Sequence, residues 1–213
     1  MPPTASTVEG QPATRDRLVE SAAALFSRHG YAATGVKAVL AAADAPYGSL
    51  YHFFPGGKQQ LGVAALVHNG AHYRALLESA YPPGTDVVEA TAASFVRAAD
   101  LLEATDYVDA CPIATIALEV ASTDEPMRIA AAEAFESWLE VLEQRFAAAG
   151  MTAARARDVA VEVFCLMEGS VLLSVTTRSS APMRIAGRTA TTAVAAGLAA
   201  DQNRPRKPGR RRS

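Results

Sequence analysis

The sequence predicts an all-α protein in which three short helices near the N-terminus precede a larger set of helices. Half of the 213 residues are apolar and only 7% are aromatic, and this alanine-rich composition favours helix over sheet. Apolar residues recur at helical spacing, as Leu18, Ala22, Leu25 and Phe26 do. We identify no convincing strand and no internal repeat, so the predicted fold class is all-α.

Composition and charge favour a cytoplasmic protein that does not enter a membrane. No apolar run approaches the ~20 residues that span a bilayer, and the N-terminus lacks the features of a signal peptide. Cys111 and Cys165 are too few for a disulfide framework. The net charge of −2 does not exclude nucleic-acid binding, which depends on local patches.

Both ends of the chain differ in composition from the rest. Residues 1–14 are rich in Pro, Thr and Ser without periodicity, which predicts a disordered arm. Acidic residues are concentrated in residues 61–203, whereas the final RPRKPGRRRS carries six basic residues. We predict a basic disordered tail over residues 202–213, which either attracts phosphates nonspecifically or has no role.

Residues 15–60 predict a unit of three short helices. Thr14 is a suitable N-cap for the first helix, and Gly30 ends it. Thr34 is the expected cap of the second helix, and Asp44 tolerates the left-handed conformation that a tight turn demands. Because the last two helices are joined by this turn, the unit is predicted to be a helix-turn-helix.

The third helix lies in APYGSLYHFFPGGK, residues 45–58, which is rich in aromatic and hydrogen-bonding groups. Pro46 begins the helix and a Pro-Gly-Gly run ends it. Leu50, with Phe53 or Phe54, is expected to face inward. The remaining side chains then point outward or sideways: Tyr47, Gly48, Ser49, Tyr51 and His52.

Such a helix is typical of one that reads DNA, since the second helix of a helix-turn-helix enters the major groove. Tyr and Ser side chains suit base edges or phosphates, and Lys58 suits a phosphate. Gly48 allows either close packing or close approach to DNA. We predict DNA contacts from Pro46, Tyr47, Gly48, Ser49, Tyr51, His52 and Lys58; the alternative is a plain surface helix.

Residues 30–61, GYAATGVKAVLAAADAPYGSLYHFFPGGKQQL, resemble the DNA-binding signature of TetR-family transcriptional regulators. CPIATIALEVAS at 111–122 and MEGSVLLS at 167–174 are similar to the LmrA/YxaF-like branch. The resemblance implies a homodimer with a DNA-reading head, residues 15–60, and a helical body, residues 61–201, that binds a ligand and dimerises through its final two helices. It also implies that Thr34 and Lys37 lie at or near the DNA.

Three positions depart from the pattern of the resembled family. Asp44 stands where glycine is usual, Tyr47 where lysine or arginine is common, and Phe53 where histidine is frequent. The loss of a cation at Tyr47 is expected to weaken phosphate attraction and to shift base preference. Because of these departures, the resemblance does not predict the operator sequence. It still predicts the mode of binding.

The body is predicted to be helical near residues 58–81, 86–104, 112–121, 125–149, 152–179 and 182–200. Ligand sites combine an apolar lining with a few polar groups. The predicted ligand-binding set has this mixture, although each member also suits an ordinary core: Phe95, Leu102, Tyr107, Cys111, Thr115, Phe135, Trp138, Phe164, Cys165 and Glu168.

Two members of this set carry distinct chemistry. Glu168 lies within the apolar run VFCLMEGSVLLSV, where a buried carboxylate needs a partner or a raised pKa. A cationic or hydroxylated ligand and an arginine across a dimer are both open as partners. Cys111 precedes a proline at a helix start, where the helix dipole lowers a thiol pKa unless the thiol is simply buried.

No catalytic motif is present, since the sequence lacks a phosphate loop after a strand, a nucleophile elbow and HExxH. His68 and His72 have metal-ligand spacing but no further ligand nearby, so we expect no enzyme, metal or cofactor.

We predict a repressor that binds a palindromic operator as a homodimer and is released by a small apolar or aromatic effector, with the helix near 58–81 as the relay. The alternatives are a helical carrier or enzyme, and an activator without a ligand.

Overall fold

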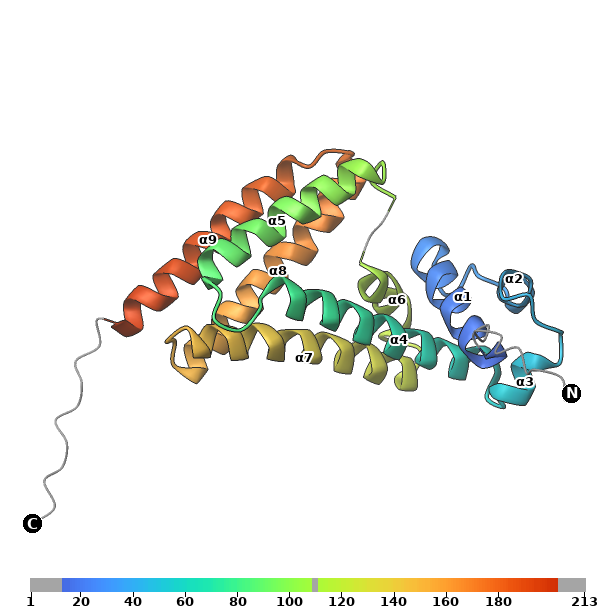
Figure 1. The fold of residues 1–213 in the computed structure, drawn as a ribbon. Helices are drawn as coiled ribbons and strands as arrows, with labels where there is room; N and C mark the ends of the chain where they lie inside the picture. Colours follow the sequence, from blue (N-terminus) through green and yellow to red (C-terminus); the bar gives the residue numbers. More distant parts are fainter. Residues whose placement is uncertain (1–12, 109–110, 203–213) are drawn as a thin grey trace, which may run out of the picture.

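The computed structural model describes residues 13–108 and 111–202, in which all regular secondary structure is helical, as predicted (Figure 1). The described helices are α1 (Thr14–His29), α2 (Val36–Ala42), α3 (Ser49–Phe53), α4 (Gly57–Ala80), α5 (Val87–Ala104), α6 (Pro112–Val120), α7 (Glu125–Ala148), α8 (Ala153–Thr177) and α9 (Ala181–Gln202). The six helices predicted for the body are confirmed with small shifts at their ends. The predicted arm and tail lie outside the described residues, except for residues 13–14 and 202.

The start and end of α1 differ in how well local sequence signals predict them. The prediction of Thr14 as N-cap is wrong, because the helix already includes it and is preceded by Ala13 without a side-chain cap. Gly30 ends α1 with φ +83°, as predicted. The predicted capping role of Thr34 is also wrong: Gly35 precedes α2, and the Thr34 hydroxyl instead donates to the Gly30 carbonyl oxygen at 2.8 Å.

The turn before α3 adopts the predicted conformation, but the helix is shorter than expected. Asp44 has φ +47°, which confirms the left-handed turn. Pro46 does not begin the helix; it lies in a turn in which the Ser49 backbone N–H donates to its carbonyl oxygen. Leu50 and Phe54 anchor the inner side at 1% exposure each, whereas Phe53 is only partly buried.

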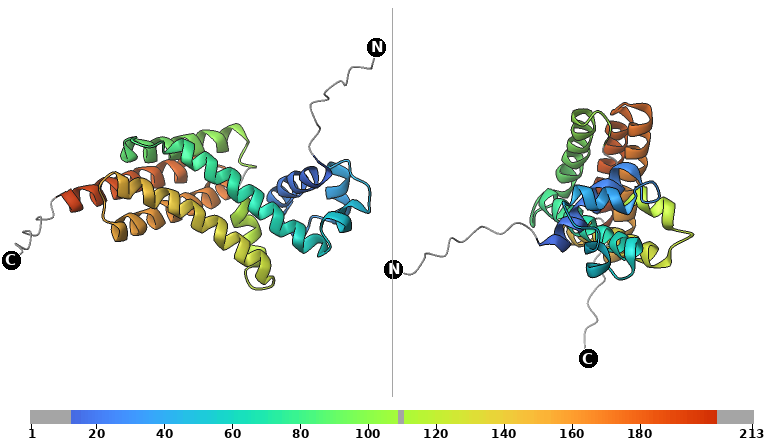
Figure 2. Two further views of the ribbon diagram at one scale, coloured as in Figure 1. Left: turned by 60° about the horizontal axis from the view of Figure 1, so that its bottom comes forward. Right: turned by 90° about the vertical axis from the view of Figure 1, so that its right-hand side faces the viewer.

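The head lies at one end of an elongated molecule, and the end of α9 lies at the other (Figures 1 and 2). α4 and α7 run side by side, and α8 and α9 pack with α5 and α7 in the body. The short helix α6 contacts α1, α4 and α7. Close approach of α4 to α7 depends on Gly70, where an added Cβ would lie 2.9 Å from the Cβ of Ala134.

Two clusters of buried side chains form the core. The first begins in α1–α3, continues through α4 and α6, and ends in α7 at Trp138. The second joins α5, α8 and α9 to the far ends of α4 and α7. The first cluster crosses the predicted boundary at residue 60, which itself falls inside α4, so the apolar interior of the head is continuous with that of the body.

α8 is apolar along most of its length. Of the helices in the two described ranges, α8 alone is long and apolar enough to cross a membrane, with a mean hydropathy of 1.8 over 18 residues, of which 28% are buried. The sequence-based statement that no apolar run is long enough overlooked this window. Because α8 packs against α7 and α9, the same property suits a core helix; its other apolar side chains are partly buried, as Leu166 is, or exposed, as Leu172 is.

Candidate nucleic-acid interface and effector site

The outer side of α2 and α3 presents most of the residues predicted to contact DNA. Tyr47 and Tyr51 are 65% and 57% exposed, which is unusual for large aromatic side chains. Lys37 and His52 are exposed as well, and Ser49 is half-buried at the first position of α3. These side chains belong to one helix-turn-helix whose inner side is fixed by its buried anchors.

Gly48 has neither of the usual structural reasons for glycine. Its φ of −70° and ψ of −16° are open to any residue. An added Cβ would meet no atom within 4 Å, so packing within the chain does not require glycine. The open space in front of this backbone favours the second of the two sequence-based readings, in which DNA approaches closely.

Thr34 and Lys58, both predicted to lie at or near the DNA, are directed into the protein. Thr34 is 4% exposed. The Lys58 Nζ donates to the Tyr31 carbonyl oxygen at 2.7 Å and lies 4.3 Å from the centroid of the Tyr31 ring. Burial lowers the pKa of Lys58 despite the opposing effect of Glu119. Both side chains therefore hold the turn between α1 and α2 together.

Two further residues that the sequence did not single out also fix the head. The Arg17 Nε donates to the Ala43 carbonyl oxygen at 3.0 Å, across the turn that precedes α3. The Glu119 carboxylate, at the end of α6, accepts from the backbone N–H groups of Ala32 at 2.7 Å and Tyr31 at 3.2 Å. Partners up to 88 positions apart leave no local signal in the sequence.

The contacts of Glu119 belong to a wider junction between head and body. The Gln59 Nε2 donates to the Asp124 carboxylate at 3.0 Å, and an added Cβ on Gly62 would lie 2.8 Å from the Met127 side chain. α6 and the start of α7 therefore hold both the α1–α2 turn and the first turns of α4.

Part of the predicted ligand-binding set comes together between α6, α7 and α8. Phe135, Trp138 and Phe164, which we call the aromatic cluster, have ring centroids 5.5 to 6.0 Å apart. The Cys111 thiol and the Glu168 carboxyl group lie close enough for each to shift the pKa of the other. Cys111 packs in the same core cluster as the three rings, so five predicted residues share one region.

The other five do not join them in a single site. Phe95 and Leu102 lie in the second core cluster, with Tyr107 packed against it. Cys165 is exposed on α8. Thr115 lies on α6 and its hydroxyl donates to the Cys111 carbonyl oxygen at 3.0 Å. Residue type alone therefore identified apolar positions of the body, but it did not show which of the two core clusters each position belongs to.

Burial determines the ionisation of the Cys111–Glu168 pair. Burial raises the pKa of the Cys111 thiol to about 12, and the neighbouring Glu168 adds to the rise. Burial also raises the pKa of Glu168, against the opposing effect of the neighbouring Cys111 thiol. The sequence-based possibility that the helix dipole makes Cys111 acidic is therefore wrong, because desolvation outweighs the backbone N–H groups of α6.

Cys111 is expected to be a slow nucleophile. In a Cys165→Ser variant, alkylation of the folded protein by iodoacetamide at pH 8 should be roughly a thousandfold slower than that of an ordinary thiol, since each pKa unit lowers the thiolate fraction tenfold. The same variant unfolded in guanidinium serves as the control and should react at the ordinary rate. Equal rates for the folded and unfolded protein would contradict the burial of this thiol.

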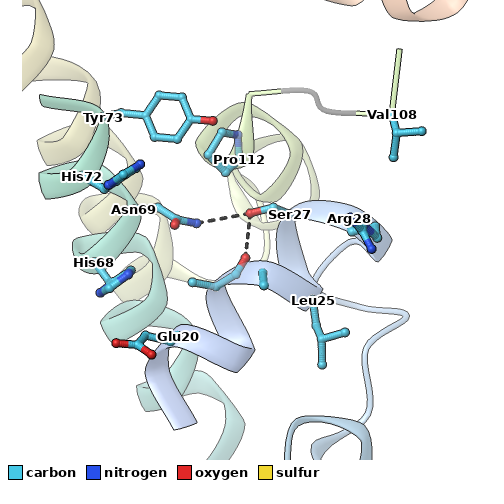
Figure 3. Close-up of a pocket in the computed structure, with 12 residues that line it drawn as sticks. Glu20, Leu25, Ser27, Arg28, His68, Asn69, His72, Tyr73, Val108 and Pro112 are labelled. Carbon is cyan, nitrogen blue, oxygen red and sulfur yellow. Dashed lines mark hydrogen bonds between the residues drawn. The ribbon is translucent and has the colours of Figure 1, made fainter. Parts of the chain in front are cut away.

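Two open cavities adjoin the head, and neither is lined by a member of the predicted ligand-binding set. One of about 460 Å³ lies between α1 and α4 and is bordered by Val108 and Pro112 (Figure 3). His68 and His72 line it, and the described residues contain no group of three potential metal ligands. Another of about 580 Å³ is lined by α1, Phe53, Phe54 and α4.

Comparisons with known proteins agree with this arrangement. Residues 18–65 match the family model for bacterial regulatory proteins of the tetR family, and residues 87–189 match the model for the LmrA/YxaF-like transcriptional regulator C-terminal domain. The chain is 31% identical over 170 residues to the HTH-type transcriptional regulator LmrA of Bacillus subtilis (strain 168), covering 80% of this chain and 90% of that protein. It is 34% identical over 179 residues to the HTH-type transcriptional regulator Rv0196 of Mycobacterium tuberculosis (strain H37Rv), covering 82% and 90%.

Solved structures show the same fold. The regulatory protein TetR from Rhodobacter sphaeroides aligns with a TM-score of 0.73 at 22% identity, covering 84% of this chain and 98% of that one. A TetR regulator from Legionella pneumophila aligns with a TM-score of 0.74 at 21% identity, covering 86% and 98%. With a helix-turn-helix at one end and relatives that are regulators rather than enzymes, the chain belongs to the LmrA/YxaF-like branch of the TetR family of DNA-binding transcriptional regulators.

Proposed function

We propose that this protein is a cytoplasmic repressor that binds a palindromic operator as a homodimer and is released by a small apolar or aromatic effector. The observation that carries the proposal is the exposed pair Tyr47 and Tyr51 on a helix-turn-helix that is tied to the body through Glu119. A head fixed in this way follows movements of the body, which is what an effector-controlled DNA reader requires.

Exposed apolar side chains on the last two helices support dimerisation through them. Leu172 and Leu173 of α8 are 63% and 55% exposed, and Ile185 of α9 is 55% exposed. Val161 adds a further exposed apolar residue on α8. Exposed apolar side chains on two packed helices are typical of an interface, and a two-fold axis there would present two α3 helices to the half-sites of a palindrome.

Operator binding is tested by fluorescence anisotropy with the DNA upstream of the protein's own gene and a scrambled duplex at near-physiological salt. A second preparation that lacks residues 204–213 separates the head from the basic tail. Tight binding to the upstream DNA alone, with or without the tail, would support the proposal. Equally weak binding to both duplexes that disappears with the tail would reject it, and promoter occupancy that raises transcription would indicate an activator.

Lys37 is expected to supply a phosphate contact. Lys37→Ala should weaken binding to every duplex and reduce the slope of log affinity against log salt by ~1, since one fewer counterion is released. Lys58→Ala removes the same charge, but its ammonium group is bound to Tyr31, so it should leave the slope nearly unchanged and lower the thermal midpoint. A larger slope change for Lys58 than for Lys37 would reverse this assignment.

A further inference from the structure

Glu168 is a largely buried acid on α8. Within residues 13–108 and 111–202 it forms no ion pair, and Cys111 is the one side chain that affects its ionisation, with no contribution from a Lys, Arg or His. Removing a carboxylate from water without a cationic partner is costly, so the group either keeps a proton or recruits a cation. The proposed binding of the operator does not involve the Glu168 side chain.

The aromatic cluster begins one helical turn away on the same side of α8. Phe164 precedes Glu168 by four residues, and its ring lies 5.5 Å from Phe135 and 6.0 Å from Trp138. Tyr73 of α4 extends the cluster, with its ring 5.7 Å from Trp138. The faces of such rings attract organic cations, and a nearby carboxylate supplies the counter-charge.

The cavity shown in Figure 3 borders this region. Tyr73 lines the cavity and packs on Trp138, and Pro112 lines it next to Cys111, the partner of Glu168. Its volume of about 460 Å³ lies within the range of small-molecule sites. Among the described residues, its lining includes the carboxylate of Glu20, the imidazoles of His68 and His72, and Arg28, which lies two turns beyond Glu20 along α1.

We propose that the effector is an organic cation with aromatic surface, which enters through this cavity, packs on the aromatic cluster and takes the Glu168 carboxylate as its counter-ion. This inference rests on the proposed ligand response. Binding would alter the interaction between Glu168 and Cys111 at the start of α6. The other end of α6 carries Glu119, which holds the α1–α2 turn, so the same helix joins the effector site to the head.

Trp138, the only tryptophan in the chain, reports binding directly. Full-length protein is titrated with tetraphenylphosphonium and with tetraphenylborate, an anion of nearly the same shape. The cation should change Trp138 fluorescence saturably, while the anion should bind at least tenfold more weakly. Equal responses to the two ions, or none to the cation, would overturn the proposal without the need for any variant.

A pair of variants assigns the charge to Glu168. Glu168→Gln should weaken tetraphenylphosphonium binding by about tenfold to a hundredfold, as expected for loss of a charged partner. The matched control Glu162→Gln removes an exposed acid from the same helix and should leave the affinity unchanged. Equal affinities in the two variants would place the cation elsewhere and overturn the assignment.

Operator binding without any probe, measured on the same preparations by anisotropy, separates this inference from the proposed function. A protein that binds its operator but does not respond to the cation would refute the effector class alone. A protein that binds the cation through Glu168 but no operator would refute the repressor and leave the cation site standing.

Discussion

Leu172→Glu is expected to convert the proposed dimer into monomers and to reduce operator affinity by ~100-fold or more, because each monomer would engage only one half-site. Leu172 is 63% exposed on α8, within the apolar surface assigned to the dimer. A carboxylate buried in an apolar interface would lack a compensating partner, which is strongly unfavourable. Light scattering after size-exclusion chromatography measures the mass, and anisotropy measures the affinity.

Leu118→Glu is the matched control. Leu118 is 82% exposed on α6, outside α8 and α9, so the same chemical change there should leave both mass and affinity unchanged. If Leu172→Glu remains dimeric and binds the operator normally, the dimer uses another face. If Leu118→Glu is the variant that dissociates, that face includes α6.

Phe26→Ala is expected to lower the free energy of unfolding by ~3–5 kcal/mol, the usual result of truncating a buried aromatic ring. Phe26 is fully buried in the first core cluster, and its ring packs edge-on against Tyr31 at 5.2 Å. Because this cluster continues into α4, α6 and α7, the loss should shift a single cooperative transition rather than unfold the head alone. Denaturation followed by circular dichroism and by Trp138 fluorescence measures both effects.

The exposed Tyr47 provides the comparison for that experiment. Tyr47→Ala removes a similar ring from the surface and should change the unfolding free energy by no more than ~0.5 kcal/mol. A Phe26→Ala variant whose circular dichroism changes before its Trp138 fluorescence would mean that the head unfolds separately, contrary to the shared core.

The sequence predicted those features that depend on neighbouring residues. The helices of the body follow from apolar periodicity and cap chemistry, while Gly30 and Asp44 have the positive φ values that their residue types suit. Thr14 and Thr34 failed as caps because a competing arrangement was available in each case: the helix starts one residue earlier, and the Thr34 hydroxyl closes the preceding turn.

The candidate sites were less predictable because their contacts connect distant parts of the chain. The sequence suggests that Lys58 binds a phosphate, but in the structure its ammonium group donates to the Tyr31 carbonyl oxygen, 27 positions away. Glu119 looks like an ordinary helix-surface acid, yet it binds two backbone N–H groups of the head. Apolar periodicity predicts that Phe95 and Trp138 are buried, but not that they belong to different core clusters.

The core shared by head and body limits how this regulator can be recombined with its relatives. A chimaera cut at residue 60 would divide α4 and the first core cluster, and would give the new head a body shaped for another α1–α2 turn. In this chain the Glu119 carboxylate accepts from the backbone N–H groups of Tyr31 and Ala32. A transplanted head would therefore have to be transferred together with the glutamate that binds its α1–α2 turn. The unit of exchange is therefore the head together with α6 and the adjoining turns of α4 and α7.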